Sequence, residues 1–169
     1  MPTTGTLQIL ANVGETLAVP ENRSGTIFDI INQSYTYANG NGAGQNNRVW
    51  SNRSTLAGAG FDVIDLNGGG LLDAFGVAVN FASVTGIVIN NRSAVAAAIL
   101  NFGPNAADAP FLWTFTAAAS LIQIPVSGCY CQWDDAGRAV VAGVSDQIRI
   151  TNTTVAQAID YDILIIGRT

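Results

Sequence analysis

The chain has 169 residues, of which 49% are hydrophobic and only 11% are charged, with a net charge of −5 at pH 7 and neither histidine nor lysine. Its length fits one domain with a sizeable core, and the lack of a basic stripe argues against nucleic acid or an anionic membrane surface as a partner. Without His and Lys, the Ser–His and Cys–His pairs, Schiff-base lysines and phosphate-loop lysines of many enzymes are excluded.

The sparse charge predicts assembly with other chains. Typical globular domains carry about 25% charged residues, so a monomer of this composition would have a poorly solubilised surface. Burial against neighbours removes that problem, and we expect a homo-oligomer. All seven basic residues are arginines, and interfaces favour arginine because its planar fork pairs with carboxylates and carbonyls.

The first 47 residues predict an arm, some strands and a loop. Residues 1–5 are expected to be a loose arm, and strands are predicted at 6–10, 15–19 and 26–31, the last continuing toward Tyr37. Residues 39–47 consist mainly of Gly and Asn, which predicts an exposed loop that packs nothing and is flexible or ordered only by a neighbour. We therefore expect residues 1–20 to form an N-terminal arm or first strands, and residues 21–169 to form one β-sandwich domain.

Glycine-rich turns divide the rest of the chain into short strands. The central stretch 55–91 holds a strand that ends at Leu66, a reversal at 68–70, a turn with Asp73 and Phe75, and two more strands. The alanine-rich run 94–102 is interpreted as a strand because strand-like blocks flank it. The sequence Asp-Asp-Ala-Gly at 134–137 predicts a tight turn with glycine in the left-handed region. Further strands are predicted at 48–53, 111–116, 121–125, 129–133, 138–141, 146–151 and 159–166.

About ten short strands without a convincing long helix predict an all-β fold. We expect an antiparallel jelly-roll-like β-sandwich of about eight to ten strands. Strand alternation also predicts which side chains are buried in its core. These are Phe61, Val63, Val77, Val79, Phe81, Ile87, Ile89, Ile122, Ile124, Ile148, Ile150, Ile163 and Ile165.

Two carboxylate pairs are the candidates for acid chemistry. Asp160 and Asp162 share a strand face and resemble a glycosidase pair, but strand alternation explains them more simply as an exposed polar face opposite Tyr161. Asp134 and Asp135 offer oxygens to calcium, although Asp beside Gly is more typical of a capped turn. We therefore predict no catalytic residue, and the chain is not expected to be an enzyme.

No metal or cofactor is predicted either. Cys129 and Cys131 are too few for a closed metal site without other subunits, and we interpret them as reduced thiols of a cytosolic product. The glycines at 68–70 lack the lysine and helix of a phosphate loop. Trp50, Trp113 and Trp133 fit either a sugar platform or burial in a core or subunit contact. The five Asn-x-Ser/Thr triplets, at Asn22, Asn32, Asn52, Asn91 and Asn152, are interpreted as turn and strand-end residues.

The glycine turns and strands of residues 48–167 carry a family resemblance. The motifs are Thr55-Leu-Ala-Gly, Asp65-Leu, Leu72-Asp-Ala-Phe-Gly76 and Val84-x-Gly-Ile-Val-Ile, followed by Ile124-Pro-Val-x-Gly128, the run from Asp135 to Gly143, the run from Asp146 to Asn152, and Tyr161-Asp-Ile-Leu-Ile-Ile-Gly167. This pattern resembles small virion structural proteins of tailed bacteriophages. Residues 1–47 lie outside the resemblance.

The resemblance implies a structural role in the virion. Its leading form is a capsid decoration (cement) protein, made in the host cytoplasm, that trimerises on the outer capsid surface and binds the major capsid protein without nucleic acid or membrane partners. The alternative is a phage tail or receptor- or carbohydrate-binding structural protein. The candidate interface residues are Thr6, Leu7, Gln8, Ile9, Leu10, Arg48, Arg53, Arg92 and Arg138. The first five are expected to add a strand to a neighbour's sheet, unless the segment packs on its own sandwich.

Overall fold

The computed structural model describes residues 5–19, 23–105, 115 and 120–169, with the backbone course alone at 9–19 and 23–33. The strands of these residues are β1 (Gly5–Val19), β2 (Arg23–Asn39), β3 (Gln45–Asn46), β4 (Arg48–Leu56), β5 (Phe61–Asp65), β6 (Leu71–Leu72), β7 (Ala78–Val79), β8 (Ser83–Asn91), β9 (Leu100–Pro104), β10 (Ile122–Ile124), β11 (Cys129–Ala139), β12 (Gln147–Asn152) and β13 (Ile159–Arg168). The described part contains no helix, and hence none long and apolar enough to cross a membrane.

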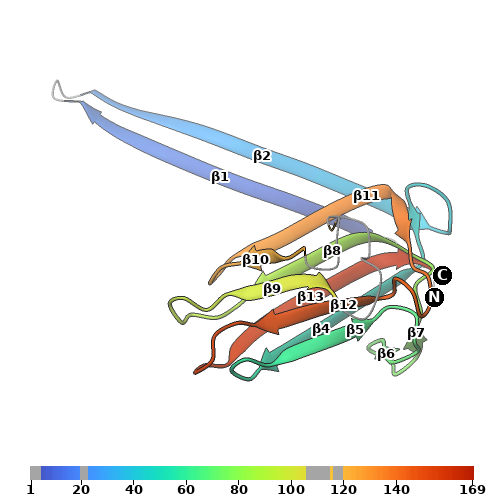
Figure 1. The fold of residues 1–169 in the computed structure, drawn as a ribbon. Coiled ribbons are helices and arrows are strands. Elements are labelled where there is room, and N and C mark those ends of the chain that lie inside the picture. The colour runs from blue at the N-terminus through green and yellow to red at the C-terminus, as the bar shows by residue number, and fades with distance from the viewer. Residues whose placement is uncertain (1–4, 20–22, 106–114, 116–119) are drawn as a thin grey trace.

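Two four-stranded antiparallel sheets form the body of the molecule (Figure 1). One has the order β10-β9-β12-β5 and the other the order β11-β8-β13-β4. The chain passes from one sheet to the other at most of its connections, so strands distant in sequence become neighbours. β13, for example, pairs with both β4 and β8. The prediction of an all-β antiparallel sandwich is confirmed.

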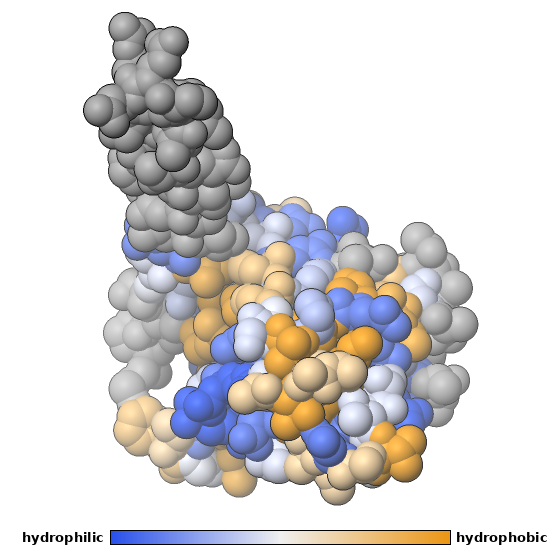
Figure 2. All heavy atoms as spheres, turned by 90° about the vertical axis from the view of Figure 1, so that its left-hand side faces the viewer, coloured by the Kyte–Doolittle hydropathy of each residue, from blue (hydrophilic) through white to orange (hydrophobic). Residues whose placement is uncertain are grey.

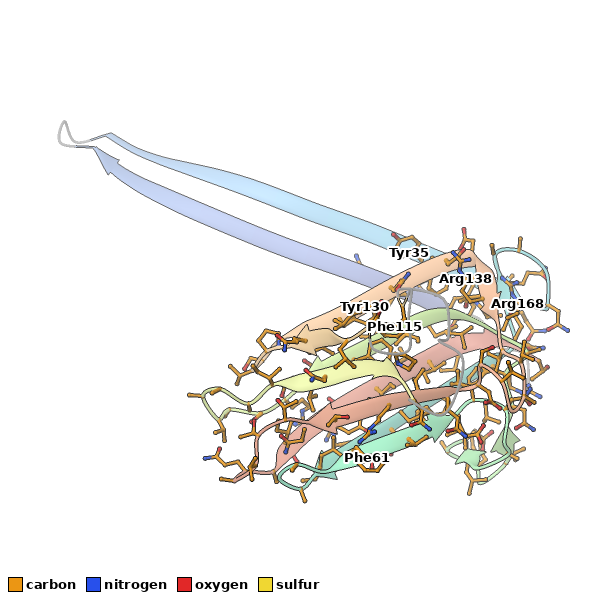
Figure 3. The ribbon with its side chains drawn as sticks, viewed as in Figure 1. Tyr35, Phe61, Phe115, Tyr130, Arg138 and Arg168 are labelled. Carbon is orange, nitrogen blue, oxygen red and sulfur yellow. The ribbon has the colours of Figure 1, made fainter. Side chains whose placement is uncertain are left out.

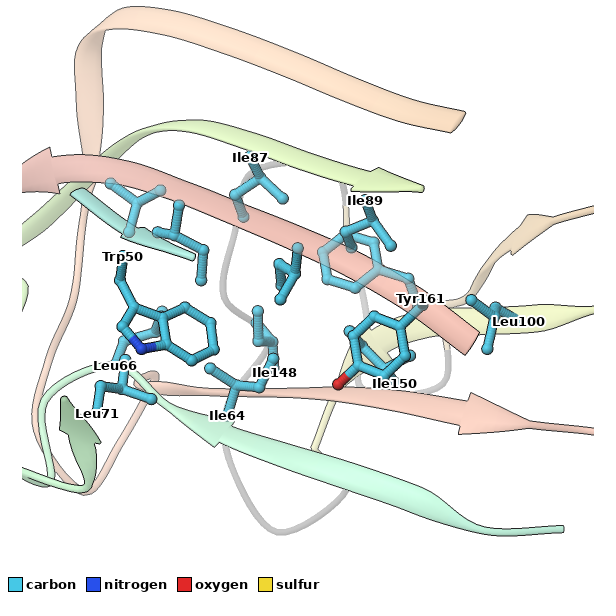
Figure 4. Close-up of a cluster of buried hydrophobic side chains, with 14 of the residues drawn as sticks. Trp50, Ile64, Leu66, Leu71, Ile87, Ile89, Leu100, Ile148, Ile150 and Tyr161 are labelled. Carbon is cyan, nitrogen blue, oxygen red and sulfur yellow. The ribbon is translucent and has the colours of Figure 1, made fainter. Parts of the chain in front are cut away.

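The core lies between the two sheets (Figure 4). Register places Ile163 beside Ile89 and Ile165 beside Ile87 on one sheet, while Ile148 and Ile150 face them from the other. Burying each such side chain contributes roughly 1.5–3 kcal/mol. The predicted core residues that are buried are Val79, Phe81, Ile87, Ile89, Ile124, Ile148, Ile150, Ile163 and Ile165.

Three predicted core residues are wrong. Phe61 and Val63 are exposed because β5 turns its other face inward, burying Ile64. Asp62 shares that inward face, and the Tyr161 hydroxyl donates a hydrogen bond of 2.7 Å to its carboxylate, which compensates for its partial burial. Val77 is exposed just before β7. Ile122 is partly buried against the core.

Two local predictions also need correction. Only the end of the alanine-rich run is extended, because β9 begins at Leu100 and residues 92–99 are irregular. Residues 134–137 do not form a hairpin turn; β11 continues through them, and its pairing with β8 shifts between Trp133 and Arg138 as in a β-bulge. Gly137 does have the predicted positive φ, at 73°. The predicted strand at 111–116 lies outside the described residues apart from Phe115, which is buried.

Two asparagines hold the irregular segments that follow strands β8 and β12. The Asn91 amide donates to the carbonyls of Ala98 and Ile124 at 3.0 and 3.1 Å. The Asn152 amide donates to the carbonyls of Ala57 and Gln157 at 3.0 and 2.7 Å. Both side chains are fully buried, so each replaces backbone pairing that the irregular chain has lost. Their interpretation as strand-end residues is confirmed, but it is wrong for Asn32 and Asn52, which lie within β2 and β4, and Asn22 lies outside the described residues.

Strands β1 and β2 form one long hairpin, here called the arm. They pair in continuous antiparallel register from Gly5 opposite Tyr37 to Val19 opposite Arg23. The strands predicted at 6–10 and 15–19 are therefore one strand. Figure 1 shows the arm leaving the sandwich beside β11 and projecting well beyond it. The structure thus joins the first strand to residues 23–39.

Candidate assembly surface

A stack of three aromatic rings attaches the arm to the sandwich. The rings of Tyr35 and Tyr37, both on β2, stack with Trp133 of β11 at centroid distances of 5.5 and 5.9 Å. Figure 3 shows Tyr35 at the base of the arm, beside β11. The indole nitrogen of Trp133 donates to the Asp135 carboxylate at 2.5 Å. Aromatic pairs of this kind contribute about 0.5–1.5 kcal/mol beyond burial, so these rings fix where the arm begins.

Trp133 in turn lies on the outer face of the sheet β11-β8-β13-β4, meaning the face turned away from the core. A Cβ atom added to Gly86 of β8 would stand 2.9 Å from Cε3 of the indole. Register places Gly86 between Trp133 and Ile166, and Ile166 is only 3% exposed although it lies on this outer face. The base of the arm therefore covers one end of the outer face.

The described residues leave the opposite end of the outer face uncovered. Register aligns Cys131, Val88, Leu164 and Ser51 across the four strands, and aligns Cys129, Asn90, Asp162 and Arg53 in the next rung but one. Val88 and Leu164 are half-buried although they point away from the core. A hollow of about 630 Å³, here called the outer groove, is lined by the β4, β8 and β13 members of these rungs but not by Cys129 or Cys131 of β11. Its floor is apolar and its end is polar.

A small charge cluster forms the polar end of the outer groove. The Asp162 carboxylate pairs with Arg53 at 2.7 Å and with Arg92 at 3.4 Å. Asp160, two rungs further, accepts a hydrogen bond of 2.5 Å from the Thr55 hydroxyl. Pairs this exposed contribute at most about 1 kcal/mol each. The two aspartates thus have separate partners on an exposed strand face, and the interpretation of this face as polar surface is confirmed.

Register separates the four predicted interface arginines into two pairs. Arg53 and Arg92 meet at Asp162. Arg48 and Arg138 belong to the far end of the same sheet, near Gly167 and Val84. Arg48 donates to its neighbouring Asn47 carbonyl at 3.0 Å, and Arg138 pairs with Asp134 at 3.2 Å on the surface. Of the four, only Arg53 lines the outer groove, and Arg92 reaches its edge through Asp162.

The remaining predicted interface residues lie in the arm. Thr6, Leu7, Gln8, Ile9 and Leu10 pair with residues 32–36 of β2. They therefore already form a sheet within their own chain. The other edge of β1 is the outer edge of the arm, and no strand of the described part pairs with it.

Arg168, a residue that sequence analysis did not single out, orders the loop at 39–47. Its buried guanidinium donates to the carbonyls of Gln45 at 2.8 Å and Ala136 at 3.0 Å, and also to that of Asp135 (Figure 3). Asn46 of the same loop is buried and accepts a hydrogen bond of 2.7 Å from the Thr85 hydroxyl. The expectation that this loop packs nothing is wrong.

The tryptophans do not form a three-ring sugar platform, because Trp50 is buried in the core. Trp133 is stacked under the arm, and Trp113 lies outside the described residues. No cluster of three potential metal ligands occurs in the described residues. Cys129 and Cys131 are free thiols. Burial raises the pKa of both, and the neighbouring Cys129 raises the pKa of Cys131 further, so both favour the unreactive protonated form.

The hairpin of β6 and β7 forms an apolar projection that was not predicted from the sequence. Leu72, Phe75 and Val77 are exposed there, Phe75 by 75%. The Asp73 carboxylate holds the turn by accepting from the backbone amides of Phe75 and Val77 at 2.8 and 2.9 Å.

Figure 2 shows the face on the side of the arm tip as a mixture of hydrophobic and hydrophilic residues.

Comparisons with known proteins add little to this picture. No protein-family model matches the chain, and no curated protein matches it. A solved structure titled "Crystal structure of PirA" is similar to the chain with 12% sequence identity and a TM-score of 0.38, over 70% of this chain and 94% of that one. A likeness of this strength carries no argument about function.

Proposed function

We propose that the chain is a decoration (cement) protein of a phage head, which assembles as a homo-oligomer on the outer capsid surface. The arm is the observation that carries the proposal. Its strands have 15 and 17 residues, and 15 residues at about 3.3 Å per residue extend roughly 50 Å. A hairpin of this reach, paired mainly with itself, is suited to linking neighbouring subunits.

The edge of the arm supports the same function. Soluble proteins normally cover, shorten or charge an exposed strand edge, because its free amides and carbonyls recruit other strands. β1 contains one charged residue, Glu15, in 15 residues and no proline. In a symmetric shell such an edge gives affinity through main-chain hydrogen bonds, and many copies together bind strongly even where each contact is weak.

The composition and the surface fit a structural role rather than catalysis. The chain lacks His and Lys, and the described carboxylates form ion pairs, hold turns or accept hydrogen bonds from neighbouring side chains. The exposed apolar turn at Phe75 provides a second contact point toward the shell. The major capsid protein is the partner that this role requires.

Immunogold labelling of intact phage particles tests the location. An antibody against this protein is expected to label the head surface in many copies. Labelling confined to the tail or its tip would overturn the decoration role and favour the alternative of a tail or receptor-binding structural protein. A parallel glycan array is expected to show no saturable binding.

A further inference from the structure

We propose that the outer groove is the acceptor for the arm of a second copy of this chain. The inference rests on the proposed function in that it identifies where the linking arm binds. The contact is between two copies of the chain, so the outer groove is present before any capsid is bound.

The outer groove continues a contact that the arm already makes. Within one chain the arm base covers the Gly86 rung of the outer face through Trp133 and Tyr35. Further along the same face, the rungs of Val88 and Asn90 are left open by the described residues. The arm diverges from the sheet beyond its base (Figure 1), so its own chain leaves this part of the face to another occupant.

The polarity of the arm matches that of the outer groove. Tyr35 and Tyr37 have odd numbers, as do their respective partners Leu7 and Gly5, because the register pairs odd positions of β1 with odd positions of β2. The other odd positions of β1 are mainly apolar in sequence, with Ile9, Ala11, Val13, Leu17 and Val19. The β1 half of this face, which is mainly apolar, fits a groove whose floor is Val88 and Leu164. The β2 half of the same face adds Ile27 and Ile31 together with the charged residues Arg23 and Asp29.

Acidic groups of the arm meet arginines at the groove. Residues 5–39 contain the carboxylates of Glu15, Glu21 and Asp29 and one arginine, Arg23, a net charge of −2. At the polar end of the groove, Arg53 and Arg92 surround the Asp162 carboxylate and Asp160 lies beyond it, so the cluster is neutral overall but presents two guanidinium groups. Because the whole chain has a net charge of −5, an acidic arm is steered toward the few places where arginines gather.

A second copy fits better than the chain's own arm. The aromatic rings of Tyr35, Tyr37 and Trp133 fix the arm base at one end of the outer face, and bending the paired hairpin back would break its continuous register. An arm that binds the next copy makes a head-to-tail contact, which closes into a ring when the rotation between copies allows it. Two copies that exchange arms already satisfy both grooves, and a trimer is the next closed assembly.

Cross-linking between differently tagged copies tests the proposal. Both copies carry Cys129→Ser and Cys131→Ser; one also carries Leu164→Cys in the outer groove and the other Val13→Cys in the arm. A short bis-maleimide is expected to join them in a mixture. The matched controls are Asn12→Cys, on the even-numbered positions of the arm, and Val63→Cys, on the exposed face of the other sheet. Each control is expected to lower the yield at least several-fold.

Two results would overturn the inference. One is a yield no higher than in the controls. The other is efficient cross-linking within a single chain that carries both Leu164→Cys and Val13→Cys, which would show the arm bound to its own groove. If cross-linking fails but immunogold labels the head, the decoration role still holds and the groove contact is refuted. If cross-linking succeeds but the gold label lies on the tail, the groove contact is supported and the decoration role is refuted.

Discussion

Trp133 lies so close to Gly86 that any side chain at position 86 would collide with the indole. The distance from an added Cβ to Cε3 is 2.9 Å. Glycine inside a strand costs stability and often marks the close approach of another group. Here that group is the ring that supports the base of the arm, so a single glycine in the middle of β8 links the sandwich to the arm.

Gly86→Ala is therefore expected to displace the indole and loosen the arm. Limited proteolysis should cut within residues 5–39 several-fold faster than in the unchanged protein, while the sandwich stays intact. Gly70→Ala is the matched control, because a Cβ at Gly70 meets nothing within 4 Å. Equal cleavage rates in the two variants would show that Trp133 does not hold the arm.

Asn152→Ala is expected to lower the free energy of unfolding by about 2–3 kcal/mol, because buried carbonyls lose their donor. The Asn152 amide serves the carbonyls of Ala57 and Gln157, and its oxygen accepts from the amide of Thr154 at 2.8 Å. Chemical denaturation measures the change. Asn80→Ala, at an exposed asparagine, should change stability by less than about 0.5 kcal/mol. Similar losses in both variants would contradict this role of Asn152.

Stability should decline in alkali because of Tyr161. Burial, followed by the hydrogen bond to Asp62, raises the pKa of this phenol well above its usual 10.0. The folded protein then keeps the proton where the unfolded chain loses it, so the contribution is complete below about pH 10 and is lost as pH rises further. Denaturation curves from pH 8 to 11.5 should show a shallower decline for Tyr161→Phe. Identical slopes would exclude Tyr161 as the cause.

Arg53→Glu is expected to weaken self-association about tenfold, because it removes a positive charge at the outer groove and adds a negative one. Sedimentation velocity across a concentration series measures this. Arg138→Glu is the matched control, since Arg138 is also exposed and ion-paired but belongs to the opposite end of the sheet. If both variants associate equally well, the groove is not the charged contact.

The sandwich could be predicted from alternation, but the inward face of β5 could not. Phe61 and Val63 alternate as well as Ile64 and Leu66 do, and the larger aromatic ring favoured the wrong set. The inward face also carries Asp62, which is accommodated there by hydrogen bonds from the hydroxyls of Ser54 and of Tyr161, the latter 99 residues away in sequence. A contact of that range leaves no local signal.

The candidate surface was less predictable for the same reason. The odd-numbered apolar positions of residues 5–19 are visible in the sequence. The sequence does not show, however, that residues 5–19 pair with residues 23–39. The contact between Tyr35 and Trp133 joins segments almost 100 residues apart. Arg168 has no local signal in the sequence, because its three carbonyl partners belong to a loop and a bulge.

Co-sedimentation with phage heads stripped of accessory proteins tests the central claim most directly. The purified protein is expected to bind heads saturably, at a simple ratio to the major capsid subunits. Val13→Glu in the arm is expected to reduce this binding, and Asn12→Glu to reduce it much less. The contradicting result is the absence of saturable binding to heads, or binding that is the same for the unchanged protein and both variants.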